Sequence, residues 1–219
     1  MPKRPDNKDT SSAQLAAWQG EFGDDYVDRN SADEVALAAR TKMWTRILDS
    51  LSADPPATIL EVGANLGLNL RSLDRVTSAR LMAVEPNQKA RDHLIADGVV
   101  RTEDVHDGIA AAIPLPDSTA DLVFTSGVLI HIAPDDLLAS CREIHRVAKR
   151  YVLSIEYFAD RPEEVEYRGR EGLLFKRDFG DFWMNNFTDL SIVDYGFFWR
   201  RVTTLDNLTW WLFQKRRQG

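Results

Sequence analysis

A short apolar run that leads into a glycine turn constrains the fold of this chain more than any other segment. Residues 58–67 read Thr-Ile-Leu-Glu-Val-Gly-Ala-Asn-Leu-Gly, and a helical pattern follows them. This order predicts a buried strand, a sharp turn and a helix N-terminus, where open α/β sheets bind nucleotide-like ligands. The acid, Glu61, can accept hydrogen bonds from a ligand amine or hydroxyl. The segment lacks the lysine of a phosphate cradle, and Asn65 stands where a dinucleotide fingerprint needs glycine.

Length and charge narrow the class of protein. A chain of 219 residues is long enough to form one domain with a sizeable core. Its formal net charge of −7 argues against nucleic-acid binding through phosphate contacts. We expect no membrane partner, because no apolar run reaches the roughly 18 residues of a spanning helix. The lone cysteine, Cys141, fits a reducing cytoplasm, and its helical apolar surroundings predict a buried packing residue rather than a nucleophile.

Strand-like and helix-like segments alternate through the middle of the chain. We expect strands at 58–62, 81–84, 99–102, 121–125 and 151–155, with helices at about 66–75, 87–98 and 135–149. This alternation predicts a parallel sheet with right-handed crossovers. Two later strands, at 190–198 and 208–213, would add an antiparallel hairpin to the edge of that sheet.

The segments outside this core are less regular. Residues 11–53 are expected to be mostly helical, with a turn-like break at 21–26, and 160–181 to be a loop with a short helix. We therefore expect a disordered tail at 1–10 and a single domain at 11–219. Its parts would be a helical cap (11–53), a ligand-binding core (54–156), a lid (157–189) and the hairpin (190–219).

Two further segments point to the same ligand site. Glu85 ends the second strand, 18 positions beyond Gly67, close to the spacing of a ribose-binding acid. Because Pro86 follows it, an N-cap acid is the alternative reading. After the strand at 121–125, the small pair Ser126-Gly127 would let the backbone approach a ligand. His131 then lies near the expected reacting centre, either as a general base or as a structural histidine.

Aromatic and basic residues flank the core on both sides. Tyr26 and Arg29 precede it, whereas Tyr157 and Tyr167 follow the fifth strand. Aromatic faces suit a cationic ligand, and arginine forks suit an anionic one. A solvated charged surface with scattered core aromatics is the alternative. The basic residues that we expect to bind an anionic substrate are Arg168, Arg170, Lys176 and Arg177.

The core at 59–155 resembles the class I S-adenosylmethionine (SAM)-dependent methyltransferases. More specifically, several segments resemble the pseudaminic acid biosynthesis-associated methylases. They are residues 18–30, 124–132, 156–157, 166–169, 174–179, 193–197 and 209–211. The chain departs from that family at 200–204, Arg-Arg-Val-Thr-Thr, where the family tends to be richer in Asn, Asp and Pro.

The resemblance implies a Rossmann-like α/β fold. Its mostly parallel, seven-stranded sheet would carry the antiparallel hairpin and an N-terminal helical lid. It also implies SAM as cofactor, S-adenosylhomocysteine as product and no metal. The residues that would bind the cofactor are Tyr26, Arg29, Glu61, Gly63, Asn65, Gly67, Glu85, Pro86, Asp104, Val105, Ser126, Gly127 and Leu129.

The implied acceptor is a small polar, anionic molecule such as a nonulosonic acid or a related glycan precursor, methylated on O or N. His131 is the expected base, with Tyr157 or Tyr167 as alternatives, in a monomer or homodimer. Other readings are a methyltransferase for another metabolite or a macromolecule, and a non-catalytic cofactor-binding protein. A nicotinamide oxidoreductase is disfavoured, because Asn65 would crowd a pyrophosphate.

Overall fold

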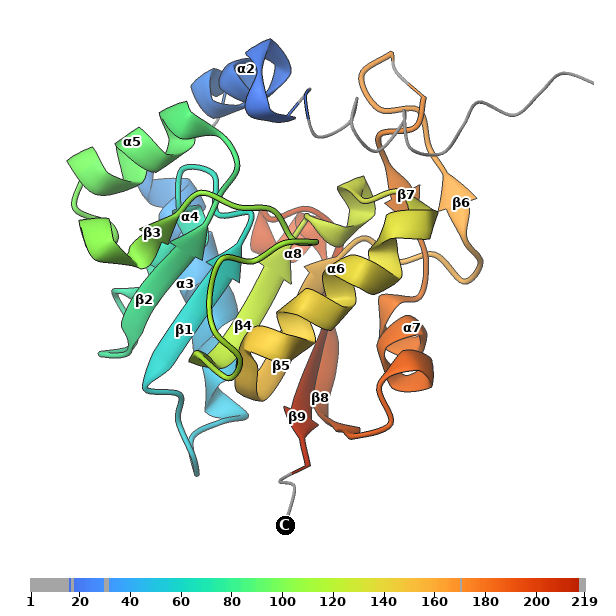
Figure 1. Cartoon of the computed structure of the whole chain (residues 1–219). Helices are drawn as coiled ribbons and strands as arrows, with labels where there is room; N and C mark the ends of the chain where they lie inside the picture. The colour runs from blue at the N-terminus through green and yellow to red at the C-terminus, as the bar shows by residue number, and fades with distance from the viewer. Residues whose placement is uncertain (1–15, 17, 30–31, 170, 217–219) are drawn as a thin grey trace, which may run out of the picture.

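A seven-stranded mixed sheet forms the centre of the molecule (Figure 1). The structure, a computed structural model, describes residues 16, 18–29, 32–169 and 171–216. From one edge to the other, the strands are β3 (Val105–His106), β2 (Arg80–Val84), β1 (Thr58–Val62), β4 (Ala120–Ser126), β5 (Ala148–Glu156), β9 (Leu208–Lys215) and β8 (Leu190–Phe198).

The pairing explains the apolar character of the central strands. β1 pairs in parallel with both β2 and β4, and β4 pairs in parallel with β5. Parallel strands covered on both faces are apolar at successive positions, and both Ile59 and Leu60 are fully buried. β9 runs antiparallel between β5 and β8. The predicted mostly parallel sheet with an antiparallel C-terminal hairpin is therefore confirmed.

Helices cover both faces of the sheet. α3 (Glu34–Asp49), α4 (Leu68–Leu73) and α5 (Gln88–Ala96) lie on one face, and α6 (Pro134–Val147) and α7 (Phe179–Asn186) on the other (Figure 1). Strand side chains alternate between the two cores. Phe124 packs edge-on against Trp44 of α3, with ring centroids 4.6 Å apart, whereas Val123 joins the α6 core. Cys141 is fully buried in that second core, as predicted.

Smaller elements lie around the ends of the parallel strands. α2 (Glu21–Arg29) packs against α5 (Figure 1). The others are two 3₁₀ turns, η1 (Thr102–Asp104) and η2 (Leu129–His131), a two-stranded ribbon of β6 (Glu163–Glu164) and β7 (Phe175–Lys176), and α8 (Arg200–Thr203). No helix among the described ranges is both long and apolar enough to cross a membrane.

Three sequence expectations differ from this structure. The predicted turn-like break at 21–26 was wrong, because the helix α2 runs through Gly23. A Cβ there would lie 1.9 Å from the Trp18 carbonyl oxygen, so this glycine permits close packing. The strand at 99–102 was also wrong, because residues 102–104 form η1 and β3 starts at Val105. Residues 160–181 contain the β6–β7 ribbon before α7 begins. The expected tail at 1–10 lies outside the described residues.

Candidate functional site

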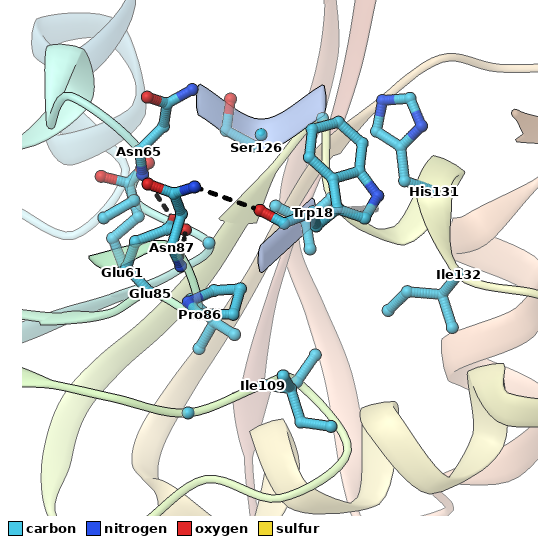
Figure 2. Close-up of a pocket in the computed structure, with 18 of the residues that line it drawn as sticks. Trp18, Glu61, Asn65, Glu85, Pro86, Asn87, Ile109, Ser126, His131 and Ile132 are labelled. Carbon is cyan, nitrogen blue, oxygen red and sulfur yellow. Dashed lines mark hydrogen bonds between the residues drawn. The ribbon is translucent and has the colours of Figure 1, made fainter. Parts of the chain in front are cut away.

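A cavity of about 300 Å³ opens at the carboxyl ends of the parallel strands (Figure 2). Its wall comes from the loops after β1, β2, β3 and β4, from α6 and from the segment around Trp18. In Figure 2, Glu61, Asn65 and Glu85 lie on one side of the cavity, and Trp18 and His131 lie on the other. Segments far apart in sequence therefore meet where an open α/β sheet binds its ligand.

The glycine turn after β1 fits closely against the turn after β4. Gly63 has a φ of +78°, which L side chains rarely adopt. A Cβ at this position would lie 2.6 Å from Cγ2 of Val128. Asn65 also has a positive φ, of 48°, in the left-handed region that asparagine tolerates better than most residues. These conformations bring the backbone of the β1 turn to the cavity surface.

Glu85 closes this turn from the end of β2. Its Oε2 accepts a hydrogen bond from the Asn65 backbone N–H at 2.8 Å, and its Oε1 accepts one from the Asn87 N–H at 2.9 Å. The N-cap of α5 is Asn87, whose Oδ1 accepts the Ala90 N–H, so the N-cap reading of Glu85 was wrong. Burial raises the pKa of the Glu85 carboxyl. The carboxylate keeps acceptor sites for a ligand hydroxyl.

Glu61 faces the same cavity with one oxygen unused by the described residues. Its Oε1 accepts a hydrogen bond from Asn69 Nδ2 at 2.7 Å, and Asn69 Oδ1 in turn accepts one from Trp44 Nε1 at 3.4 Å. Oε2 is buried and has no described partner, and the same is true of Asn65 Oδ1. Burial raises the pKa of Glu61 to about 8. Because unpaired buried acceptors are costly, this pair fits a ligand that donates from an ammonium or hydroxyl group.

His131 stands at the other side of the cavity, at the end of η2. Its Nδ1 lies 2.6 Å from the Leu173 carbonyl oxygen. A carbonyl only accepts, so Nδ1 carries the hydrogen and Nε2 of the neutral ring is left as an acceptor. Burial lowers the pKa of the ring, which favours this neutral form. The rings of Trp18 and Tyr167 flank it, with centroids at 4.9 and 5.1 Å. This geometry is compatible with a structural role for His131, because the ring is anchored by Leu173, and with a role as general base, because the ring lines the cavity.

The structure brings part of the predicted cofactor set together. The predicted cofactor residues that line the cavity are Glu61, Gly63, Asn65, Glu85, Pro86, Ser126 and Gly127. Those that do not are Arg29, Gly67, Asp104, Val105 and Leu129. Leu129 packs in the α6 core, and Asp104 is turned away to form a bidentate pair with Arg80. The backbone of Tyr26 lies in α2, but its side chain is outside what the structure describes.

The remaining predicted residues that the structure describes do not line the cavity. Tyr157 donates from Oη to Asp206 Oδ2 at 2.9 Å, whereas Tyr167 contacts His131. The described basic side chains also have partners outside the cavity wall. Arg168 lies over the Tyr167 ring at 5.4 Å, Lys176 pairs with Glu163 at 3.5 Å, and Arg177 lies over the Phe182 ring at 4.5 Å. Arg170 is outside the described residues.

Several cavity residues were absent from the predicted site, although the segment 18–30, which contains Trp18, was singled out. Trp18 and Asn87 meet across 69 positions, where Asn87 Nδ2 donates to the Trp18 carbonyl at 3.3 Å and to Asp24 Oδ1 at 2.9 Å. Arg40 of α3 and Asp136 of α6 also line the wall. Asn69 had a usable signal, because it lies eight positions after Glu61, on the first helix after the glycine turn.

Comparisons with known proteins agree with this geometry. Residues 60–152 match a family model described as a methyltransferase domain. No curated protein matches the chain. A Burkholderia thailandensis 1,6-didemethyltoxoflavin-N1-methyltransferase, solved with bound 1,6-didemethyltoxoflavin and S-adenosylhomocysteine, is similar in fold. The TM-score is 0.66 and the sequence identity 15%, and the alignment covers 99% of this chain and 93% of the other. A Synechocystis magnesium protoporphyrin IX methyltransferase with bound SAM has a TM-score of 0.64 and a sequence identity of 12%, and the alignment covers 98% of this chain and 100% of the other. A Leishmania major SAM-dependent methyltransferase has a TM-score of 0.67 and a sequence identity of 17%, and the alignment covers 93% of this chain and 90% of the other.

Proposed function

We infer that this chain is a SAM-dependent methyltransferase that transfers a methyl group to an O or N atom of a small polar acceptor. The observation that carries the inference is the pair of buried carboxylates, Glu61 and Glu85, which face one cavity from neighbouring strands. Residues 60–152, the part that matches the methyltransferase domain, include both.

The residues around the cavity fit the cofactor. The unpartnered oxygens of Glu61 and Asn65 would accept from its ammonium or hydroxyl groups, and Glu85 would accept from its ribose. Pro86 and Ile109 offer apolar contact to its base. When bound, SAM supplies a methyl group already activated on a sulfonium. The protein therefore needs mainly to hold and orient the acceptor, an effect that can supply roughly 7–11 kcal/mol of the barrier.

His131 is the residue that we propose as the base. Its Nε2 can accept the proton that an acceptor hydroxyl or amine loses, and the ring then becomes an imidazolium. The Nδ1–H bond to the Leu173 carbonyl holds the ring orientation in both states. Trp18 and Tyr167 flank the ring and limit the access of water.

The acceptor that we propose is a nonulosonic acid or a related glycan precursor. The resemblance of the flanking segments supports this choice, and Lys176 lies on β7, which packs against the η2 turn of His131. The names of two structural neighbours, a didemethyltoxoflavin and a magnesium protoporphyrin methyltransferase, support a small acceptor in general. A polar metabolite outside the glycan class is the second candidate, because no described arginine of the predicted cluster lines the cavity.

Labelled SAM tests the proposal. The purified protein is incubated with the cofactor and a panel of nonulosonate intermediates and other small acceptors, and products are separated by mass. We expect one acceptor to gain a single methyl group, at a rate that depends on Glu85. Label in protein or RNA fractions of an extract would instead assign a macromolecular acceptor. Cofactor binding without any methylated product would assign a non-catalytic role.

A further inference from the structure

A fully buried carboxylate lies beneath the turn that carries His131. Glu156 ends β5, has no exposed surface and does not line the cavity. Its Oε1 accepts from Thr125 Oγ1 at 2.9 Å and from the backbone N–H groups of Val128 and Leu129 at 3.3 and 3.2 Å. Its Oε2 accepts from the Ile130 N–H at 3.4 Å. One side chain therefore satisfies three successive backbone donors.

The turn needs an external acceptor because it cannot satisfy these donors itself. Gly127, with a φ of +67°, reverses the chain after β4, and the following η2 is a single 3₁₀ turn of three residues. The first N–H groups of any helical turn lack an internal partner, and burial makes an unpaired donor costly. A carboxylate offers two accepting oxygens, whereas glutamine offers one and would aim an NH₂ group at the remaining donors.

Stability alone does not explain an acid at this position. Among the ion pairs of the described residues, none includes Glu156. A buried anion without a cation costs free energy of folding, and burial raises the pKa of Glu156 to about 7. The fold gains no charge pairing from this acid, so its distinguishing contribution is the set of hydrogen bonds that it accepts from the turn.

We propose that Glu156 is a positioning residue that fixes the 127–131 turn and, through it, the placement of His131 and of the cavity wall at Val128. Val128 packs against the Gly63 turn, and His131 ends the same 3₁₀ turn whose first amides bind Glu156. The inference rests on the proposed function in one respect, namely that His131 serves the acceptor.

A comparison of two buried acids tests this proposal. Asp121 is the control, because it is buried at the opposite end of the sheet, where it accepts from the Ala57 and Thr58 N–H groups at 2.9 and 3.3 Å and, unlike Glu156, also pairs with Arg150. We expect Glu156→Gln to lower kcat roughly tenfold to a hundredfold, with a fall in melting temperature no larger than that of Asp121→Asn. Asp121→Asn should lower the melting temperature and leave kcat within about twofold.

Amide hydrogen exchange supplies a measurement that does not require the methyl acceptor to be known. In the wild type, the amides of Val128, Leu129 and Ile130 should be protected, and in Glu156→Gln they should exchange roughly tenfold faster. If the glutamine variant does not fold, Glu156→Asp tests the same point, because it keeps the charge but is one methylene too short to reach all donors.

The outcomes separate this proposal from the proposed function. Unchanged kcat together with unchanged exchange in the variant that folds would overturn the positioning role. A loss of kcat in Asp121→Asn as large as that in Glu156→Gln would also overturn it, because any destabilised core would then lower kcat. A wild-type protein that methylates nothing contradicts the proposed function instead, and the exchange rates then decide on Glu156 by themselves.

Discussion

Replacing Gly63 with alanine should damage cofactor binding more than it damages the fold. The substitution has two separable effects. The first is conformational, because a φ of +78° in an L residue costs about 1–2 kcal/mol. The second is steric, since the new Cβ would lie 2.6 Å from Val128 Cγ2, whereas carbon atoms prefer roughly 3.5–4.0 Å. Val128 must therefore shift by about 1 Å, and Val128 lines the cavity.

Gly98→Ala isolates the conformational effect. Gly98 has a φ of +67°, and nothing lies within 4 Å of the Cβ that alanine would add. For a protein of this size, 1–2 kcal/mol corresponds to a fall in melting temperature of about 2–8 °C. We expect both variants to show such a fall. Only Gly63→Ala should weaken SAM binding, by roughly tenfold, because only there is the cavity wall displaced.

Titration calorimetry and thermal melts measure the two effects. Adding Val128→Ala to the Gly63→Ala variant should restore much of the affinity without restoring the melting temperature, with Val128→Ala alone as the reference. Equal SAM dissociation constants for Gly63→Ala and Gly98→Ala would refute the steric reasoning.

Three further predictions concern polar groups of the site. The raised pKa of Glu61 means that its contribution to stability is present below the unfolded pKa of about 4.3 and is lost as the pH rises through about 8. In urea titrations without cofactor, the free energy of unfolding of Glu61→Gln should therefore rise relative to that of the wild type by a few kcal/mol as the pH rises to about 9. A difference between the two proteins that does not change with pH would argue against a buried ionisable group at this position. His131→Gln should lower kcat by about a hundredfold or more with little change in SAM affinity, as steady-state kinetics on the identified acceptor can check; full turnover would remove the base role. Asn87→Asp keeps the N-cap of α5, but it loses the hydrogen-bond donor to the Trp18 carbonyl and places a second carboxylate beside Asp24. SAM should therefore dissociate several-fold faster, as stopped-flow measurements can check. An unchanged dissociation rate would show that this contact does not hold the Trp18 segment over the cavity.

Local pattern was sufficient to predict most of the sheet. The apolar runs that became β1, β4 and β5 lie at the predicted positions, give or take a few residues, because buried parallel strands must be apolar at nearly every position. The β8 range was predicted at residues 190–198 and is observed there. Glu61 and Glu85 were found by their spacing to the glycine turn, which is a local property.

Long-range contacts decided what the sequence could not predict. Gly23 was interpreted as a break, yet a side chain there would meet the side-chain amide nitrogen of Asn87, which is 64 positions away, as well as the Trp18 carbonyl. Trp18 lines the cavity, and Asn87, 69 positions later in the chain, donates to its carbonyl. The basic residues near Lys176 read as a substrate-binding cluster, but composition cannot show that Lys176 pairs with Glu163 instead.

The position of β9 in the sheet has a consequence for the order in which the molecule is assembled. β9 is later in the chain than β8, yet it lies between β8 and β5. As the ribosome releases the polypeptide, β8 emerges with no strand to pair with, and its exposed Tyr195 and Phe197 stay next to an unpaired backbone. β9 supplies hydrogen bonds to both neighbours at once. The sheet is therefore completed only when the last strand, β9, pairs with both of its neighbours. A nascent chain halted before Leu208 carries an open sheet edge that can bind a chaperone or aggregate.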